Sequence, residues 1–110
     1  MAILDWWADY PDGDNFLYPL FHSGSAGPGG NYAFYADGVT DSLLLVARRT
    51  TDDAARTALY RAIDEQVHRD APWIYLWFPV DLWAGQPGVQ GWELPVIFSG
   101  QRWTTVRREP

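Results

Sequence analysis

The clearest pattern in the chain is a stripe of apolar residues with helical spacing between residues 54 and 70. Its members recur at intervals of three and four residues, as on the buried face of an amphipathic helix. They are Ala55, Leu59, Ala62, Ile63 and Val67. The Thr-Thr-Asp-Asp run at residues 50–53 offers N-capping side chains, and Pro72 follows the stripe. We therefore predict a helix that is capped within residues 50–53 and ends at about Asp70.

The pattern predicts a shorter helix immediately before this one, so that residues 38–70 form two helices. Thr40 is the expected N-cap, and two arginines at residues 48–49 lie where the helix dipole favours cations. The apolar face of this helix is expected to hold Leu43, Leu44 and Ala47.

Strands are predicted on either side of the helices. Residues 2–7 form a short apolar run that ends at a turn-forming Asp-Tyr-Pro-Asp-Gly cluster. Residues 73–78, WIYLWF, are continuously apolar between prolines, which is typical of a strand covered on both faces. Further strands are expected within residues 80–84, 89–94 and 102–106, with a turn at 85–88, so that residues 73–106 consist of strands.

Two segments before residue 38 are predicted to be less regular. Residues 15–21 can form a helical turn that Pro19 keeps short, and the glycine-rich residues 22–32 form a surface loop. The whole order of elements predicts a mixed α/β (α+β) fold in a single segment, residues 1–110.

Composition narrows the classes of partner. The seven tryptophans and the apolar fraction of 47% argue against disorder. The net charge of −6 excludes a basic nucleic-acid-binding surface, and no apolar run is long enough to insert into a membrane. The N-terminus, MAILDWW, has none of the features of an export signal, so we expect none in this chain.

No metal, cofactor or catalytic motif is expected from the sequence. Asp12-Gly13-Asp14-Asn15 only superficially resembles the start of a calcium loop, and we interpret these residues as turn-forming and capping residues. The two histidines are 46 positions apart, the chain has no cysteine, and no GxSxG or SxxK motif is present. The chain is therefore expected not to be an enzyme.

Trp6, Trp7 and Asp9 are the candidate ligand-binding residues. In a strand, positions 7 and 9 point to one face, so an indole and a carboxylate would lie side by side. This pair suits a primary ammonium, through a charge-assisted hydrogen bond and cation–π attraction. Two alternatives stay open. The tryptophans can be core residues with Asp9 starting a turn, or the Trp/Asp surface can belong to a small carbohydrate-binding or glycoside-processing domain.

Four separated motifs resemble the closing segment of one bacterial family. They are W-x-A-D-Y-P-D-x-D-N-F at residues 6–16, N-Y-x-x-Y at 31–35, T-D-x-x-x-R-x-x-x-Y at 51–60 and D-A-P-W-I at 70–74. In this order they resemble the extracellular solute-binding proteins of family 5, the dipeptide-, oligopeptide- and nickel-binding receptors of ABC transporters. The similarity covers nearly the whole chain, but family members are several times longer.

The resemblance implies the C-terminal portion of a two-lobed, periplasmic-binding-protein-like (type II) fold that is incomplete on its own. It implies that residues 1–16 form a hinge-crossing strand and ligand-site turn, that Asp9 receives the α-ammonium of a short peptide, and that Trp6 and Trp7 line the pocket wall. It also implies ABC permease partners and a periplasmic or membrane-associated extracellular location. Gly13 departs from the proline that many members have, which is expected to loosen the turn.

Overall fold

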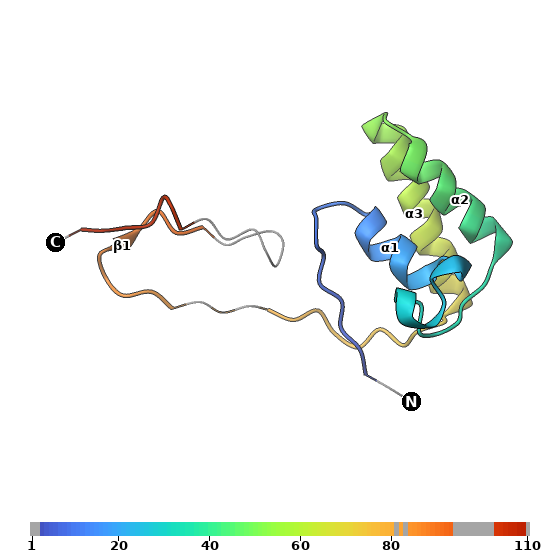
Figure 1. The fold of residues 1–110 in the computed structure, drawn as a ribbon, viewed down its shortest axis with the longest axis horizontal. Coiled ribbons are helices and arrows are strands. Elements are labelled where there is room, and N and C mark those ends of the chain that lie inside the picture. The colour runs from blue at the N-terminus through green and yellow to red at the C-terminus, as the bar shows by residue number, and fades with distance from the viewer. Residues whose placement is uncertain (1–2, 81, 83, 94–102, 110) are drawn as a thin grey trace.

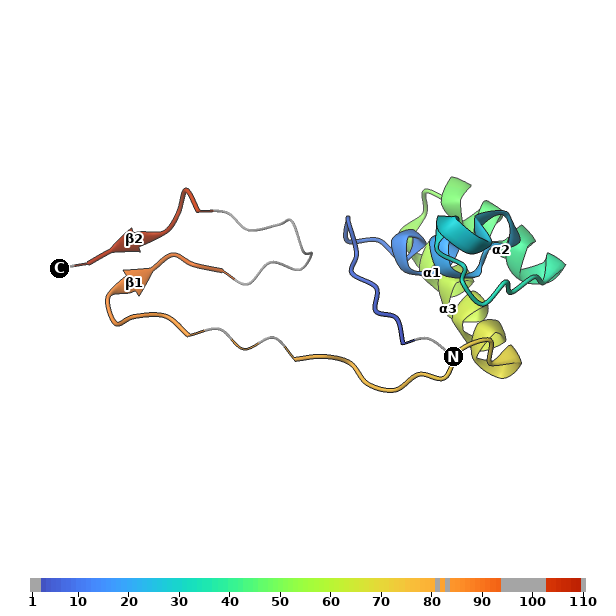
Figure 2. The same cartoon turned by 60° about the horizontal axis from the view of Figure 1, so that its bottom comes forward.

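Helices gather at one end of the molecule, and a small antiparallel sheet lies at the other (Figure 1). The computed structural model describes residues 3–80, 82, 84–93 and 103–109. Within them the α-helices are α1 (Asp14–Phe21), α2 (Gly38–Arg49) and α3 (Asp53–Asp70). The sheet consists of β1 (Val89–Gln90) and β2 (Arg107–Arg108), which pair antiparallel and are seen side by side in Figure 2. The predicted mixture of helix and sheet is confirmed.

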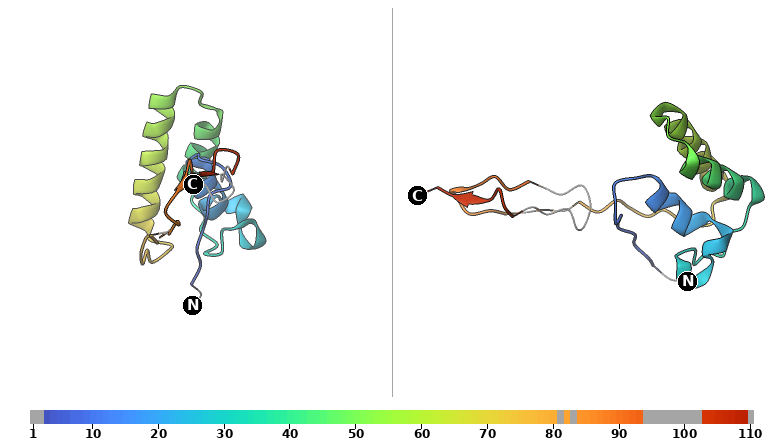
Figure 3. Two further views of the ribbon diagram at one scale, coloured as in Figure 1. Left: turned by 90° about the vertical axis from the view of Figure 1, so that its left-hand side faces the viewer. Right: turned by 45° about the horizontal axis from the view of Figure 1, so that its top comes forward.

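The core lies where the three helices meet, and α2 and α3 run side by side along it (Figures 1 and 3). Its buried members are Phe21, Leu44, Ala47, Ile63 and Val67, all at most 5% exposed. Of the predicted stripe on α3, Ile63 and Val67 are buried and Leu59 is half-buried, whereas Ala55 and Ala62 are exposed. We attribute the difference to α1 and α2, which cover a narrower band of α3 than the stripe spans.

Aspartates cap both long helices. Asp52 Oδ1 accepts a hydrogen bond from Ala55 N at 2.8 Å, which confirms the predicted capping run before α3. The prediction of Thr40 as the cap of α2 is wrong. Asp37 takes this position, its Oδ2 accepting from Thr40 N at 2.7 Å, so the helix begins at Gly38. Thr40 itself is fully buried.

The predicted loop at residues 22–32 folds into two short 3₁₀-helices, Ser23–Ser25 and Gly27–Gly29. The fully buried Asn31 holds it closed. Asn31 Nδ2 donates to the carbonyl oxygens of His22 and Tyr35, and Oδ1 accepts from Tyr35 N. Gly30 is needed for this path, because its φ is 120° and a Cβ there would lie 2.9 Å from the Pro19 oxygen.

The tyrosine beside this loop ties the two long helices together at one end. The Tyr35 hydroxyl donates to Asp70 Oδ2 at 2.6 Å, at the C-terminus of α3, and lies 3.1 Å from Thr40 Oγ1 in the first turn of α2. Burial and the bond to Asp70 raise the pKa of Tyr35 to about 12, so its hydroxyl stays protonated at neutral pH. The same bond, with Gln66, lowers the pKa of Asp70.

Two predicted strands do not form in the described part of the chain, which leaves out Ala2 of the first one. Residues 3–7 and 73–78 belong to no strand, although both run extended in Figure 1. The second segment was predicted to be covered on both faces, but Ile74 is 81% exposed and Phe78 is 95% exposed. Strand formation requires a backbone partner as well as a suitable sequence, and the described residues supply no partner for these segments.

The remaining strand predictions are met only in part. Val89–Gln90 falls inside the range predicted for one strand, and a turn at residues 87–88 precedes it, but Leu94 lies outside the described residues. The last strand is Arg107–Arg108 rather than residues 102–106, of which Arg102 is not described. Residues 81 and 83 of the range 80–84 are also not described.

The chain is less compact than a typical domain of its length. Its radius of gyration is 17.8 Å, against about 13 Å for a compact domain of this length.

Candidate ligand-binding site

Residues 6–9 approach the first turn of α1, where one asparagine bonds to both ends of the segment. Asn15 Oδ1 accepts a hydrogen bond from Asp9 N at 2.8 Å. The main-chain oxygen of the same residue accepts from Trp6 Nε1 at 2.7 Å. Asn15 is only 5% exposed, and Ala8 is 6% exposed, so the segment is seated firmly on the helix. Two of the three candidate residues therefore share one anchor.

The candidate side chains differ in exposure. Trp6 is half-buried, Trp7 is 45% exposed and the Asp9 side chain is on the surface. The strand geometry expected to align Trp7 with Asp9 is absent, because residues 3–7 pair with no strand in the described part of the chain. What the structure provides instead is an extended segment in which Trp7 and Asp9 are exposed and Trp6 donates a hydrogen bond to the main chain of α1.

The turn after this segment is held to α3 by an ion pair. Asp12 Oδ1 accepts from Asp14 N at 2.8 Å and from Arg56 Nη2 at 2.7 Å. The interpretation of Asp12 as a turn-forming residue is thus confirmed. Arg56 Nη1 also donates to the carbonyl oxygens of Ala47 and Thr50, at the end of α2. One arginine therefore fixes the turn, α2 and α3 relative to one another.

A second ion pair supports the same turn from α2. Asp14 is 7% exposed, and its two oxygens face Arg48 Nε at 3.2 Å and the Tyr10 hydroxyl at 3.0 Å. The guanidinium of Arg48 in turn lies 4.1 Å from the centre of the Tyr18 ring, within cation–π range. The sequence pattern does not indicate a role for Arg48 or Arg56 in this site, because each arginine pairs with an aspartate that is far away in the sequence.

The ion pair with Arg56 shifts the titration of Asp12. Burial alone raises the pKa of the Asp12 carboxyl, but hydrogen bonds from Asp14 N and Arg56 outweigh it and lower the pKa below its ordinary value of 3.8. Burial also raises the pKa of Tyr60 to about 12, although the charge of Arg56 acts to lower it. At neutral pH, Asp12 is therefore ionised and the Tyr60 hydroxyl is neutral.

We expect Arg56→Gln to destabilise the chain by an amount that shrinks as the solution is acidified. Because the pKa of Asp12 is lower in the folded state, its contribution to stability is present above the ordinary value of 3.8 and is lost as the pH falls through the folded-state value. Thermal unfolding from pH 7 to pH 2.5 measures this. The exposed Arg61, changed to glutamine, is the control. If the difference in stability between the parent and Arg56→Gln is constant over this pH range, the assigned ion pair between Asp12 and Arg56 is contradicted.

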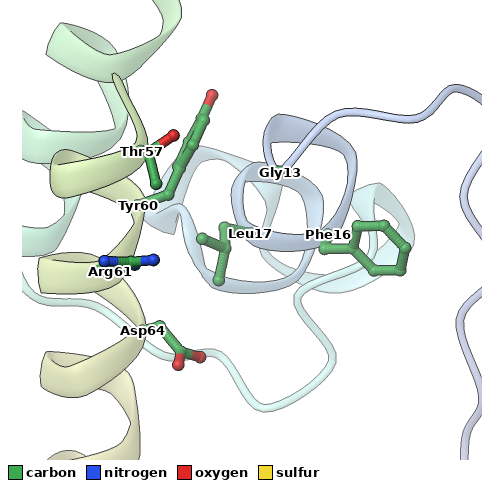
Figure 4. Close-up of a pocket in the computed structure, with 7 residues that line it drawn as sticks. All are labelled: Gly13, Phe16, Leu17, Thr57, Tyr60, Arg61 and Asp64. Carbon is green, nitrogen blue, oxygen red and sulfur yellow. The ribbon is translucent and has the colours of Figure 1, made fainter. Parts of the chain in front are cut away.

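An open groove lies between α1 and α3, with a volume of about 320 Å³ (Figure 4). Its floor is largely apolar, and Arg61 and Asp64 stand along the α3 side. The lining residues are Gly13, Phe16, Leu17, Thr57, Tyr60, Arg61 and Asp64. None of the three candidate residues lines it, so the groove and the surface around Asp9 are separate features of the described chain.

The described residues contain no group of three or more His, Cys, Asp or Glu side chains that could hold a metal ion. The aspartates near α1 have other partners: Asp12 faces Arg56, and Asp14 faces Arg48. His22 Nδ1 accepts from Gly24 N, and the His22 ring stacks on Tyr18.

No helix in the described ranges is both long and apolar enough to cross a bilayer.

Comparison with curated proteins finds relatives along most of the chain. Di/tripeptide-binding protein 4 of Pseudomonas aeruginosa is 32% identical over 105 residues, which is 96% of this chain and 20% of that protein. The periplasmic oligopeptide-binding protein OppA of Escherichia coli is 30% identical over 92 residues, 84% of the chain and 16% of OppA. The glutathione-binding protein GsiB of Pectobacterium atrosepticum is 39% identical over 72 residues, 64% of the chain and 14% of GsiB.

The matched segment is a small part of each of these relatives, at most 20% of its length. No family model matches the chain, and no solved structure matches it. The relatives are binding proteins by name, and none of the three is named as an enzyme.

Proposed function

Because the chain is homologous to a segment of the family 5 solute-binding proteins of bacterial ABC transporters, we propose that it forms the C-terminal part of a receptor that captures short peptides for import. The observation that carries this proposal is the similarity to a di/tripeptide-binding protein along 96% of the chain. Relatives named for oligopeptides and for glutathione, itself a short peptide, point to the same class of ligand.

In this proposal Asp9 receives the α-ammonium of the peptide. Its carboxylate is exposed and its main chain is fixed, so the acceptor is presented at low entropic cost. A charge-assisted hydrogen bond joins it to the ammonium, and the half-exposed indole of Trp7 adds apolar and cation–π contact. Trp6, which is bonded to Asn15, forms the wall behind them.

Tight binding requires the rest of a two-lobed receptor. A micromolar affinity corresponds to about −8 kcal/mol, whereas an exposed ion pair contributes about 0–1 kcal/mol. We propose that residues 1–16 cross the hinge and that the second lobe closes over the peptide, which removes water from Asp9 and strengthens its attraction for the ammonium. The receptor binds and releases its ligand without covalent chemistry and delivers it, outside the cytoplasmic membrane, to ABC permease subunits.

The exposed apolar segment after α3 supports a larger assembly. Ile74, Leu76, Trp77, Phe78 and Val80 are each more than half exposed, with Phe78 at 95%. A contiguous apolar surface of this kind marks a site of contact with other protein, and an unpaired extended segment is prone to aggregation when left uncovered. We propose that strands in the remainder of the receptor pair with this segment and bury it.

The function is tested on the complete receptor, meaning a protein of the relatives' full length that contains this chain as its matched segment. It is obtained from the flanking reading frame or as a chimera, in which the chain replaces the matched segment of di/tripeptide-binding protein 4. We expect calorimetry to detect micromolar or tighter binding of dipeptides. Binding of oligosaccharides but not dipeptides would overturn the proposal in favour of a carbohydrate-binding domain.

A further inference from the structure

We propose that Asn15 is a positioning residue that sets the direction of the Asp9 carboxylate toward its ligand. The inference rests on the proposed function, because it assumes that Asp9 binds an ammonium, and it adds a residue that does not itself touch the peptide. The observation behind it is the bond between Asn15 Oδ1 and Asp9 N.

The geometry makes Asn15 the point through which Asp9 is oriented. The hydrogen bond from Asp9 N to Asn15 Oδ1 limits rotation about the main-chain bonds on either side of that planar peptide unit, and this rotation sets the direction in which the Asp9 Cα–Cβ bond leaves the main chain. Asn15 is 5% exposed, so water competes poorly for its Oδ1. The same residue holds the Trp6 indole through its main-chain oxygen. Asn15 therefore holds both the residue proposed to form the pocket wall and the residue that carries the carboxylate.

Asn15 is itself held by the turn that precedes α1. Its main-chain nitrogen donates to the Asp12 carbonyl oxygen at 3.1 Å, and the Asp12 side chain is bound by Arg56 of α3. A continuous series of contacts thus runs from α3 through Asp12 and Asn15 to Asp9. Exposed residues 3–5 offer no comparable support, so the orientation of Asp9 depends on the side of the segment that faces α1.

The two hydrogen bonds of Asn15 can be separated by substitution. Asn15→Ala removes the side-chain acceptor for Asp9 N but retains the main-chain oxygen that accepts from Trp6 Nε1. In the 110-residue chain, hydrogen exchange measured by NMR should become faster at the Asp9 amide and stay unchanged at the Trp6 indole. Asn15→Asp keeps a side-chain oxygen at this position and should restore slow exchange at the Asp9 amide.

Binding is then measured in the complete receptor with a dipeptide and its N-acetylated form. We expect Asn15→Ala to weaken binding of the free dipeptide about three- to tenfold, the usual effect of one net hydrogen bond, with little change for the acetylated form. Asn15→Asp should recover most of this loss. In a receptor that already carries Asp9→Asn, adding Asn15→Ala should weaken dipeptide binding by less than a further twofold. Ser42→Ala, which removes a hydrogen bond on α2, is the control and should not alter binding.

Each outcome decides the inference. Equal losses for both peptides, or losses that add to that of Asp9→Asn, assign Asn15 a general structural role and overturn the positioning role. No loss in Asn15→Ala, while Asp9→Asn does weaken binding, also overturns it and leaves the proposed function intact. If Asp9→Asn itself has no effect on dipeptide affinity, the ammonium role fails and the inference fails with it. Thermal unfolding of each variant separates a folding defect from a binding defect.

Discussion

Asp9→Asn is expected to weaken the affinity of the complete receptor for a dipeptide by about 30-fold or more. The substitution keeps the size and shape of the side chain but removes the charge, so the ammonium of the peptide is left without its counter-ion in a closed pocket. Removal of one partner of a buried, hydrogen-bonded charge pair costs roughly 2–5 kcal/mol, and 1.4 kcal/mol corresponds to about a tenfold change. Calorimetry at pH 7, with a dipeptide that has a free N-terminus and uncharged side chains, measures this loss.

Asp53→Asn is the matched control, since it makes the same change of charge on an exposed residue in the first turn of α3. We expect it to leave dipeptide affinity within twofold of the parent and to alter helix stability by a few tenths of a kcal/mol, in line with a surface charge near a helix N-terminus. Equal losses for Asp9→Asn and Asp53→Asn would indicate a general electrostatic effect rather than a direct contact with the ligand.

Leu44→Ala is expected to destabilise the helical part of the chain by about 2–5 kcal/mol. The Leu44 side chain is fully buried among residues of all three helices, including Phe21 and Ile63, so its removal leaves a cavity that rigid helices cannot fill. Small domains have net stabilities of about 5–15 kcal/mol, and the loss is therefore a large share of the total. Urea unfolding followed by helical circular dichroism measures it.

Leu45→Ala provides the comparison, because the next residue of α2 is 40% exposed. The substitution removes the same atoms from a position that is largely exposed to solvent. We expect the free energy of unfolding to change by no more than about 1 kcal/mol, which is slightly more than is typical of surface substitutions because Leu45 is partly buried. Similar losses at positions 44 and 45 would show that α2 packs by a different face from the one described.

The two long helices were predictable because their signals are local. The four-residue spacing of Ile63 and Val67 and the acidic cap at Asp52 lie within the helix or next to it, and both appear in the structure as expected. The start of α2 was mispredicted, because Asp37 and Thr40 both have side chains suited to capping. Only the structure shows that Thr40 is enclosed beside Tyr35.

The strands could not be predicted in the same way. The apolar run at residues 73–78 indicates a preference for strand, but a strand also needs a partner far away in sequence, and the described part of the chain offers none. The candidate site shows the same difference between local signals, which the sequence reveals, and contacts between distant residues, which it does not. Trp6, Trp7 and Asp9 stand out within four consecutive residues, whereas the contact between Asp12 and Arg56 joins positions 44 residues apart. No local pattern indicates such a contact.

The central claim is that Asp9 recognises a free peptide ammonium, and one comparison tests it most directly. The affinity of the complete receptor is measured for a dipeptide and for the same dipeptide with an acetylated N-terminus, in the parent and in Asp9→Asn. We expect acetylation to weaken binding to the parent by about 30-fold or more and to make little difference in Asp9→Asn. Equal affinity of the parent for the free and the acetylated dipeptide would contradict the claim.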